Sequence, residues 1–304
     1  MSTPVDAAAR RLGRLAERGA PLGPRTTYRV GGTAALFVTA EQPSDLARVR
    51  TAVLETNLAV LVLGRGSNML VADAGFPGIV VALGDAFSDV QTHTPERNAV
   101  VAGGAAPLPV VARAAAAAGI GGLEWMVGIP GSVGGAVRMN AGGHGADIAA
   151  CLREWVFTSL IGGPDGKRTA ADLDASYRHT AVRAAHVVWS ATFEGAAIEP
   201  TEAEARIGEI VRWRRENQPG GQNAGSIFTN PESDSAGRLI DSCGLKGLRI
   251  GSAEVSPKHA NFIQADPNGS ADDVHALIRE VQRRVKDMTG VELHTEVRMI
   301  GFTE

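Results

Sequence analysis

The chain has 304 residues, of which 44% are hydrophobic, and a formal net charge of -3. This length favours two domains, and the apolar content is enough to give them buried cores. The near balance of charge, with one tight basic run at Arg212–Arg215, argues against a nucleic-acid-binding protein. Cys151 and Cys243 form neither a metal-binding spacing nor a disulfide framework. No apolar stretch is long enough to span a bilayer, and the first residues lack the apolar core of a secretory signal, so we expect a cytoplasmic protein with no membrane partner.

The first part of the chain combines helical and strand periodicity. The pattern predicts a helix at 4–18 and another at 43–56. The expected strands are 35–38, 60–63, 69–72 and 79–82.

A second group of elements follows from about Ala99, where a strand begins. A helix is expected at 107–118, ended by Gly119. Strands are expected at 155–160 and 186–193.

The pattern changes near residue 198, where we place a domain boundary. Beyond it, the sequence predicts a long helix at 201–216 whose first turn is acidic. The remaining expected elements are a helix at 236–243, a strand at 261–264, a helix at 272–288 and a strand at 292–300.

The stretch from Gly128 to Gly145 reads GIPGSVGGAVRMNAGGHG and contains seven glycines. Glycine is concentrated where the backbone needs positive φ or must approach something closely. The density therefore indicates main-chain N–H groups that face a ligand, above all a phosphate-bearing cofactor. A flexible linker would be polar and rich in serine, whereas Ile129, Val133 and Val137 alternate with these glycines.

A second loop of this kind, LGRGSNML, runs from Leu63 to Leu70. Its backbone amides, hydroxyl and carboxamide suit a pyrophosphate. It matches neither the dinucleotide fingerprint nor the P-loop, and taken alone it is equally well an ordinary turn. Beside the glycine-rich stretch, ligand binding becomes the better interpretation.

Ser226 and Glu296 are candidate acid groups. An alcohol protonates only a carbanion-like acceptor, so Ser226 would need such a partner; otherwise it is a turn or N-cap serine. A carboxylate within an apolar strand is costly unless it is paired or catalytic. Alternation places His294, Glu296 and Arg298 on one strand face, where they could equally form a surface ladder of ion pairs.

Arg178 follows Tyr177 and could hold a carboxylate with its guanidinium fork, although a surface arginine explains it as well. Lys258 and His259 are candidates for contacts with an anion, and a solvated loop explains them equally.

Eight motifs in order resemble the UDP-N-acetylenolpyruvoylglucosamine reductases over nearly the whole chain, from about Thr26 to Phe302. They are TTYRVGGTA, LGRGSNMLV, GIPGSVGGAVRMNAG, SYRHT, NAGSIFTNP, SAGRLIDSCGLKG, AEVSPKHANFI and TEVRMIG. The length is similar to the family's shorter form, which lacks an additional insertion that covers the substrate.

The resemblance implies an α+β fold. It has a two-subdomain FAD-binding region of the PCMH type, similar to vanillyl-alcohol oxidase, followed by a smaller α+β substrate-binding domain. The implied ranges are an N-terminal helix at 1–20, an FAD-binding domain at 21–198 with subdomains at about 21–84 and 85–198, and a substrate domain at 199–304.

The implied activity is reduction of the enolpyruvyl group of UDP-N-acetylglucosamine enolpyruvyl ether to UDP-N-acetylmuramate, in peptidoglycan synthesis. Non-covalent FAD would relay a hydride from NADPH to the substrate. Arg178 would stabilise the charge that develops on the substrate, Ser226 would donate the proton and Glu296 would support the intermediate. The family implies a small-molecule substrate, no metal and no obligate protein partner.

The resemblance also implies binding residues. For FAD they are Gly64, Arg65, Gly66, Ser67, Asn68, Met69, Gly128, Ile129, Pro130, Gly131, Ser132, Gly134 and Gly135. For the substrate they are Tyr177, Asn223, Asn230, Arg238, Lys258, His259 and Asn261. The chain departs from the family's frequent residues at Arg65, Ser132, His144 and Thr229. Arg65 could add a cation near the pyrophosphate, and Thr229 puts affinity for the nucleotide substrate in question.

Two alternatives stay open. One is a flavin-dependent alcohol or sugar oxidase that uses O₂, in which His144 could carry FAD covalently. The other is a paralogue of the family repurposed for a specialised pathway.

Overall fold

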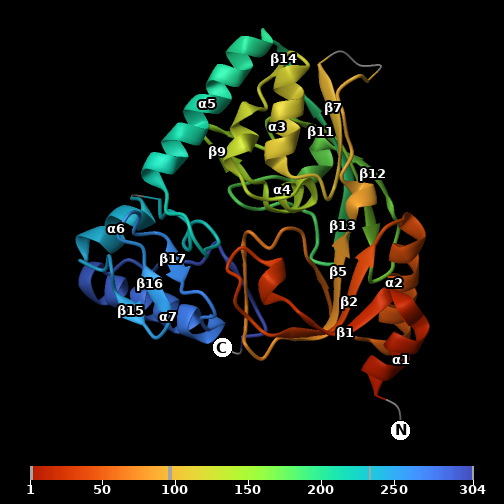
Figure 1. Ribbon diagram of the computed structural model, residues 1–304, viewed down its shortest axis with the longest axis horizontal. Coiled ribbons are helices and arrows are strands. Elements are labelled where there is room, and N and C mark those ends of the chain that lie inside the picture. Colours follow the sequence, from red (N-terminus) through yellow and green to blue (C-terminus); the bar gives the residue numbers. More distant parts are fainter. Residues whose placement is uncertain (1–2, 95–97, 233, 303–304) are drawn as a thin grey trace. The chain divides into compact units, whose positions relative to one another are not determined.

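A computed structural model describes residues 3–94, 98–232 and 234–302 (Figure 1). The chain forms two compact units. The first unit comprises Met1–Arg18, Ala35–Arg65 and Pro77–Arg214. The second unit comprises Gly19–Ala34, Gly66–Phe76 and Arg215–Glu304. Two stretches from the first quarter of the chain thus belong with the C-terminal residues, which the expected continuous ranges 1–20, 21–198 and 199–304 did not foresee. The assignment of flavin and substrate roles to those ranges remains a prediction.

A four-stranded sheet with two helices forms most of the N-terminal part of the first unit, although residues 19–21 of β1 belong to the second unit. Its order is β1-β2-β5-β3, with β3 parallel to β5. Helices α1 and α2 pack against each other (Figure 1) and bury side chains such as Leu12, Leu46 and Ile79. The bounds are β1(Ala16–Pro21), β2(Thr33–Ala40), β3(Val60–Val62), β5(Phe76–Leu83), α1(Pro4–Leu12) and α2(Pro43–Thr56).

The helix predicted at 4–18 was too long. It ends at Leu12, because Gly13 adopts φ +58 and its N–H caps the helix, after which residues 16–21 form β1.

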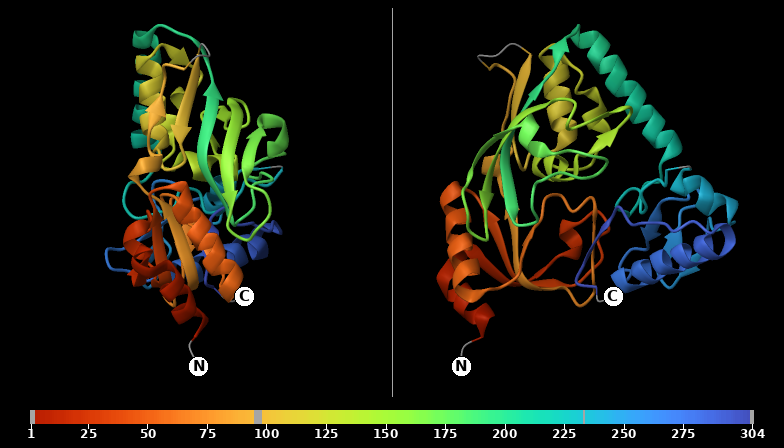
Figure 2. Two further views of the ribbon diagram at one scale, coloured as in Figure 1. Left: turned by 90° about the vertical axis from the view of Figure 1, so that its right-hand side faces the viewer. Right: turned by 180° about the vertical axis from the view of Figure 1, so that it is seen from behind.

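A five-stranded antiparallel sheet forms the rest of the first unit, in the order β12-β11-β13-β7-β6. Helices α3 and α4 lie together on one of its faces (Figure 1; Figure 2 shows the sheet from two further sides) and share its hydrophobic core. Gly119 follows α3 with φ +71, which confirms the predicted helix end. The bounds are β6(Val90–Gln91), β7(Ala99–Gly103), β11(Leu152–Ser159), β12(Gly166–Thr169), β13(His186–Glu194), α3(Leu108–Ala117) and α4(Val133–Met139).

Short elements complete the first unit. Strand β8(Ile120–Gly121) pairs with β14(Ala196–Ala197), and β9(Gly142–Gly143) pairs with β10(Ala146–Asp147). Among the described residues there are also five short 3₁₀ helices, η1(Gly13–Leu15), η2(Gly23–Arg25), η3(Asp85–Phe87), η4(Glu124–Gly128) and η5(Ala170–Leu173), of which η2 lies in the second unit.

The second unit packs two helices on a three-stranded antiparallel sheet, β15-β16-β17. Tyr28, from the N-terminal quarter of the chain, is fully buried in this core, and its hydroxyl donates to the Ile263 carbonyl at 3.0 Å. Burial raises the pKa of Tyr28. The bounds are α6(Ala236–Ser242), α7(Ala271–Thr289), β15(Arg249–Ile250), β16(Ala253–Val255) and β17(Ile263–Ala265); α5(Pro200–Asn217) leads into this unit.

A pair of parallel strands connects an early part of the second unit with its C-terminal part. In this pair β4(Met69–Val71) lies beside β18(Arg298–Ile300). The strand predicted at 292–300 is therefore present only at its last three residues. Before Arg298 the chain pairs irregularly with residues 227–229 instead.

Candidate active site

The glycine-rich stretch is only partly a loop. Residues 133–139 form α4, and Ser132 is its N-cap, with Oγ accepting from the Gly135 amide at 3.5 Å. A Cβ at Gly134 would lie 2.7 Å from the Val188 carbonyl oxygen, so close packing of the helix on β13 requires this glycine. Glycine density in this stretch was expected to reflect a nearby ligand. At Gly134 that expectation is corrected, because the glycine is required for packing of α4 on β13.

The amide groups at the start of α4 are also engaged. The Val133 N–H donates to the Ala106 carbonyl and the Gly134 N–H to the Gly104 carbonyl, both at 2.9 Å. These two amides are therefore unable to bind a phosphate in this conformation. For Gly134, predicted to contact FAD, any contact would have to avoid its N–H.

The two predicted flavin loops meet in the first unit. A Cβ at Gly64 would lie 2.7 Å from Ser132 Oγ, so any side chain at residue 64 would meet the Ser132 hydroxyl. Within the described chain, the N–H groups of Arg65, Gly131 and Ser132 donate to no protein acceptor. Two loops that meet beside N–H groups without a protein acceptor form an arrangement that suits an anionic group such as pyrophosphate. These residues therefore fit FAD.

The rest of the first loop lies in the second unit. Gly66 has φ +60, and a Cβ there would come within 2.7 Å of Thr26 Cα. Asn68 contacts the C-terminal motif twice: its Nδ2 donates to the Glu296 carbonyl at 3.3 Å, and its carbonyl accepts from the Arg298 N–H at 3.1 Å. The N–H groups of Gly66, Ser67 and Asn68 donate to no acceptor among the described residues.

Ser226 and Glu296 lie on neighbouring backbone segments of the second unit. The Glu296 N–H donates to the Ile227 carbonyl at 2.8 Å, and the Thr229 N–H donates to the His294 carbonyl at 3.0 Å. Ser226 is half-buried. The structure thus brings together three predicted residues that are far apart in sequence: Asn68, Ser226 and Glu296.

Arg178 belongs to the first unit, in a tight turn closed by two hydrogen bonds between Ser176 and His179 (3.0 and 3.1 Å). Its φ is +57, a left-handed conformation that a residue with a Cβ adopts at a cost. Its guanidinium carbon stands 5.2 Å from the centre of the Tyr177 ring. A Cβ at Gly142 would lie 3.3 Å from Arg178 Nη1, so Arg178 reaches the glycine-rich stretch.

Asn140, which sequence reasoning did not single out, connects these two motifs. It is buried, and its Nδ2 donates to the Ser176 carbonyl and to Asp147 Oδ2, both at 3.1 Å, while its Oδ1 accepts from Ala149 N–H at 2.9 Å. An asparagine directly after α4, with φ +41, was the available signal.

Most residues predicted to bind the substrate already bond within the second unit. Asn223 donates to the carbonyls of Gly220 and Gly221 and accepts from the Gly225 N–H. Asn230 accepts from the Ala236 N–H at 3.1 Å. These contacts build the loops, and the predicted contacts with the substrate remain predictions.

The charged members of the set are paired as well. Arg238 forms an ion pair with Asp234 four residues earlier. Lys258 Nζ donates to the Arg215 carbonyl at 2.5 Å, where it caps the end of α5. Tyr177, at 60% exposure, is open to solvent.

His144 packs against α5 within the first unit. Its ring meets Trp213 edge to face at 5.1 Å between centroids, and a Cβ at Gly128 would come within 3.1 Å of it. Burial, and then the charge of Arg214, lowers its pKa. Close approach of His144 therefore accounts for the glycine at 128.

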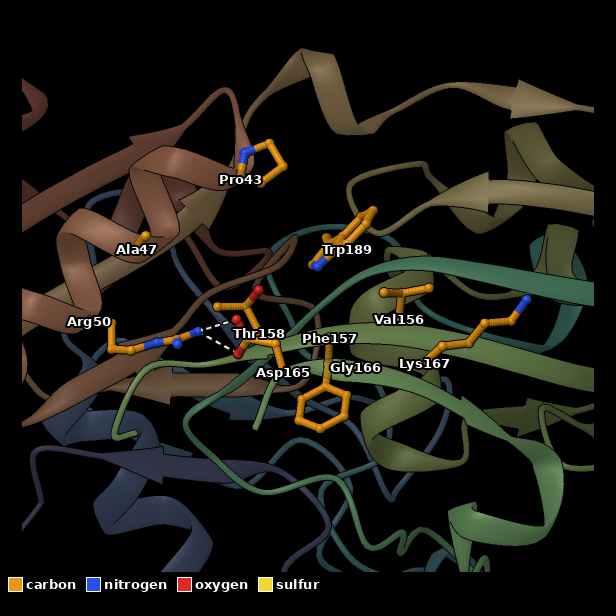
Figure 3. A pocket seen from close by; sticks show the side chains of 10 residues that line it. All are labelled: Pro43, Ala47, Arg50, Val156, Phe157, Thr158, Asp165, Gly166, Lys167 and Trp189. Carbon is orange, nitrogen blue, oxygen red and sulfur yellow. Dashed lines mark hydrogen bonds and ion pairs between the residues drawn. The ribbon is translucent and has the colours of Figure 1, made fainter. Parts of the chain in front are cut away.

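A cavity of about 300 Å³ lies elsewhere in the first unit, between α2 and strands β11, β12 and β13 (Figure 3). An ion pair between Arg50 and Asp165 and the ring of Trp189 line it. None of the predicted site residues is among its lining residues. The ion pair ties α2 to the β11–β12 connection, which gives this cavity a structural explanation.

No helix in the described ranges is long and apolar enough to cross a membrane. Among the same residues, no group of three or more His, Cys, Asp or Glu side chains is arranged to hold a metal ion.

Family models identify both halves of the chain. One described as FAD binding domain matches residues 34–170, and one described as UDP-N-acetylenolpyruvoylglucosamine reductase, C-terminal domain, matches residues 217–300. Together with the mixed helix and strand content and the paired loops, this defines an FAD-dependent oxidoreductase with an α+β fold, as the motifs predicted.

Whole-length relatives give the particular family. The chain is 42% identical to UDP-N-acetylenolpyruvoylglucosamine reductase of Synechococcus sp. (strain RCC307), over 92% of each chain. It is 41% identical to the enzyme of that name from Acidiphilium cryptum (strain JF-5), over 93% of this chain and 90% of the relative. The crystal structure of the reductase from Thermus caldophilus matches with a TM-score of 0.81 and 34% identity, over 94% of this chain and 98% of the other. The chain belongs to the UDP-N-acetylenolpyruvoylglucosamine reductase family.

Proposed function

We propose that this chain is a cytoplasmic, NADPH-dependent flavoenzyme that reduces the enolpyruvyl group of UDP-N-acetylglucosamine enolpyruvyl ether to UDP-N-acetylmuramate. The observation that carries the proposal is the convergence of Ser226, Glu296 and Asn68 in the second unit. A proton donor, a carboxyl group and a flavin-loop residue are the components that this reduction needs in one place.

The residues proposed to hold FAD are the loop Gly64–Met69 and the segment from Gly128 to Gly135. Their open amides at Arg65, Gly131 and Ser132 suit the pyrophosphate. When bound, FAD supplies the transfer of hydride from NADPH to the enolpyruvyl carbon.

Residues of the protein stabilise the charge that develops on the substrate and donate the proton that completes its reduction. Arg178 stabilises the negative charge that develops on the substrate carboxylate, and its guanidinium lies against the Tyr177 ring. The Ser226 hydroxyl donates its proton to the substrate carbon that carries carbanion character. Glu296 hydrogen bonds to the same enolate-like species through its carboxyl group.

Two half-reactions measured on FAD-loaded protein test this proposal. We expect NADPH to reduce the flavin, and the enolpyruvyl sugar nucleotide to reoxidise it. Ser226→Ala should leave the first half-reaction intact and slow the second by about 10²–10⁴-fold, the usual contribution of a positioned acid. Wild-type protein that shows no substrate-dependent NADPH oxidation would overturn the proposed activity. A Ser226→Ala variant with both half-reactions unchanged would remove Ser226 from the mechanism.

The oxidase alternative is tested on the same preparation. Acid precipitation should release the flavin into the supernatant, since we propose non-covalent binding. Flavin that stays with the precipitated chain, and is freed by His144→Ala, would favour the alternative.

A further inference from the structure

We propose that Asn261 is a positioning residue that fixes Ser226 for proton transfer and makes no contact with the substrate through its side chain. The inference rests on the proposed function of Ser226.

Both polar atoms of the Asn261 side chain are hydrogen-bonded to one residue of the Ser226 segment. Its Oδ1 accepts from the Phe228 N–H at 2.9 Å, and its Nδ2 donates to the Phe228 carbonyl at 2.8 Å. A carboxamide has a donor and an acceptor side by side, so it pairs with a peptide group as a neighbouring strand would. Asn261 is 4% exposed and therefore has no room to contact a substrate from solvent.

The main chain of Asn261 strengthens the same connection. Its carbonyl accepts from the Ile227 N–H at 2.9 Å. Ile227 and Phe228 are buried, so their peptide groups depend on these partners for hydrogen bonding. The two residues that follow Ser226 are thus held by three bonds to one residue.

On the other side of Ser226 the chain is less constrained. Gly225 has φ +77, and its N–H donates to Asn223 Oδ1 at 3.0 Å, which closes a local turn. Because this turn includes a glycine, whose backbone is conformationally permissive, the orientation of the Ser226 side chain depends mainly on the bonds that follow it in the chain. Because the Ile227 carbonyl also accepts from the Glu296 N–H, Asn261 holds in register the Ser226 segment, to which the Glu296 segment is bonded.

Asn261 is itself held rigidly. Its N–H donates to His259 Nδ1 at 3.3 Å, and the Phe262 N–H donates to the His259 carbonyl at 3.0 Å. This local turn fixes where the carboxamide points. The motif KHANF therefore supports the Ser226 segment through Asn261. From the sequence, its Lys258 and His259 side chains were candidates for contacts with an anion.

Two variants of Asn261 remove its side-chain hydrogen bonds to Phe228 to different extents. Asn261→Asp keeps the acceptor for the Phe228 N–H and loses the donor to its carbonyl, whereas Asn261→Ala loses both. In FAD-loaded enzyme we expect unchanged flavin reduction by NADPH and unchanged KM for the sugar nucleotide. Flavin reoxidation by that substrate should slow by about 10–100-fold, with Ala slower than Asp, because small misplacement of a reacting group costs that much. The solvent isotope effect on this step should rise as proton transfer becomes limiting.

A double variant separates positioning from substrate binding. If Asn261 acts through the serine, Ser226→Ala/Asn261→Asp should be no slower than Ser226→Ala alone. A raised KM, or two rate losses that multiply, would show that Asn261 contacts the substrate and would overturn the proposal. Ser252→Ala is the matched control: it removes bonds to Asp273 and Ser270 in the same unit, so it should lower stability without changing the isotope effect.

Amide hydrogen exchange tests the contact without turnover. Peptides covering residues 226–229 should exchange faster in Asn261→Ala than in wild type, and not in Ser252→Ala. If the wild-type enzyme fails to reduce the sugar nucleotide, the proposed function is refuted. Amide hydrogen exchange then still tests whether Asn261 holds the Ser226 segment. Unchanged exchange at 226–229 in Asn261→Ala would overturn the positioning role.

Discussion

The approach of the two predicted flavin loops can be tested by adding one carbon atom and then making room for it. Gly64 has no positive φ, so alanine is compatible with the backbone there. Its Cβ would lie 2.7 Å from Ser132 Oγ and 3.9 Å from Ser132 Cβ. The hydroxyl alone therefore causes the clash. Gly64 is exposed and the hydroxyl can rotate away, so Gly64→Ala should cost about 0.5–1 kcal/mol, mainly through loss of the N-cap bond of α4.

Ser132→Ala removes the obstacle and also the N-cap of α4. The capping bond is long, at 3.5 Å, so its loss should cost about 0.5–1 kcal/mol, the low end for N-caps. The double variant should then be close in stability to Ser132→Ala, a favourable coupling of about 0.5–1 kcal/mol between the two substitutions.

The assay is a thermal unfolding cycle with and without FAD, combined with FAD affinity from flavin fluorescence. For a unit of this size, about 1 kcal/mol corresponds to ~2–4 °C in Tm. Gly64→Ala should weaken FAD binding, and Ser132→Ala should restore part of it. Strictly additive effects on Tm and affinity would refute the reasoning, because the two loops would then not meet at these atoms.

Two further predictions concern backbone strain and a half-buried histidine. Arg178→Gly should be more stable than Arg178→Ala by about 1 kcal/mol in thermal unfolding, because glycine tolerates the left-handed turn, and both should lose substrate reduction. Arg183→Ala, an exposed control, should retain activity, and an alanine variant as stable as the glycine variant would contradict the strain. Burial lowers the pKa of His259 below 6.5, so the folded protein disfavours its protonation. Stability should be complete above pH 6.5 and fall as the pH drops below it, and His259→Gln should reduce this slope in urea unfolding measured from pH 5 to 8. The lowered pKa values of His144, His186 and His275 should maintain the rest of the slope. A slope in His259→Gln equal to that of the wild type would refute a contribution from His259.

Local patterns were sufficient to predict most helices. Helices α2, α3, α5, α6 and α7 begin and end within one residue of their predicted bounds. Their apolar periodicity, capping residues and terminal glycines act within a few residues of chain, so the sequence expresses them directly. The error at 4–18 came from Gly13, which was read as an interior residue and is in fact the helix end.

The candidate site was less accessible to local reasoning. Glycine density indicated close backbone approach correctly, but the partner differs from one glycine to the next. At Gly134 it is the carbonyl of Val188, at Gly128 it is the ring of His144, and at Gly64 it is the hydroxyl of Ser132. A glycine shows that space is short and says nothing about what fills the space. Likewise, Asn261 was predicted to bind the substrate, and only the structure shows its carboxamide bonded to Phe228.

The sequence by itself determined the family, the helices and the identity of the proposed reacting groups, because ordered motifs and periodicity are properties of the chain. Only the tertiary structure decided which distant segments share a core. It places Tyr28 and the strand Met69–Val71 with the C-terminal residues, and it sets Glu296 beside the Ser226 segment. The physical reason is that these associations come from packing and hydrogen bonds between residues separated by as many as 235 positions, as for the Tyr28 hydroxyl on the Ile263 carbonyl. No local pattern records the partner of a buried hydroxyl, amide or carbonyl.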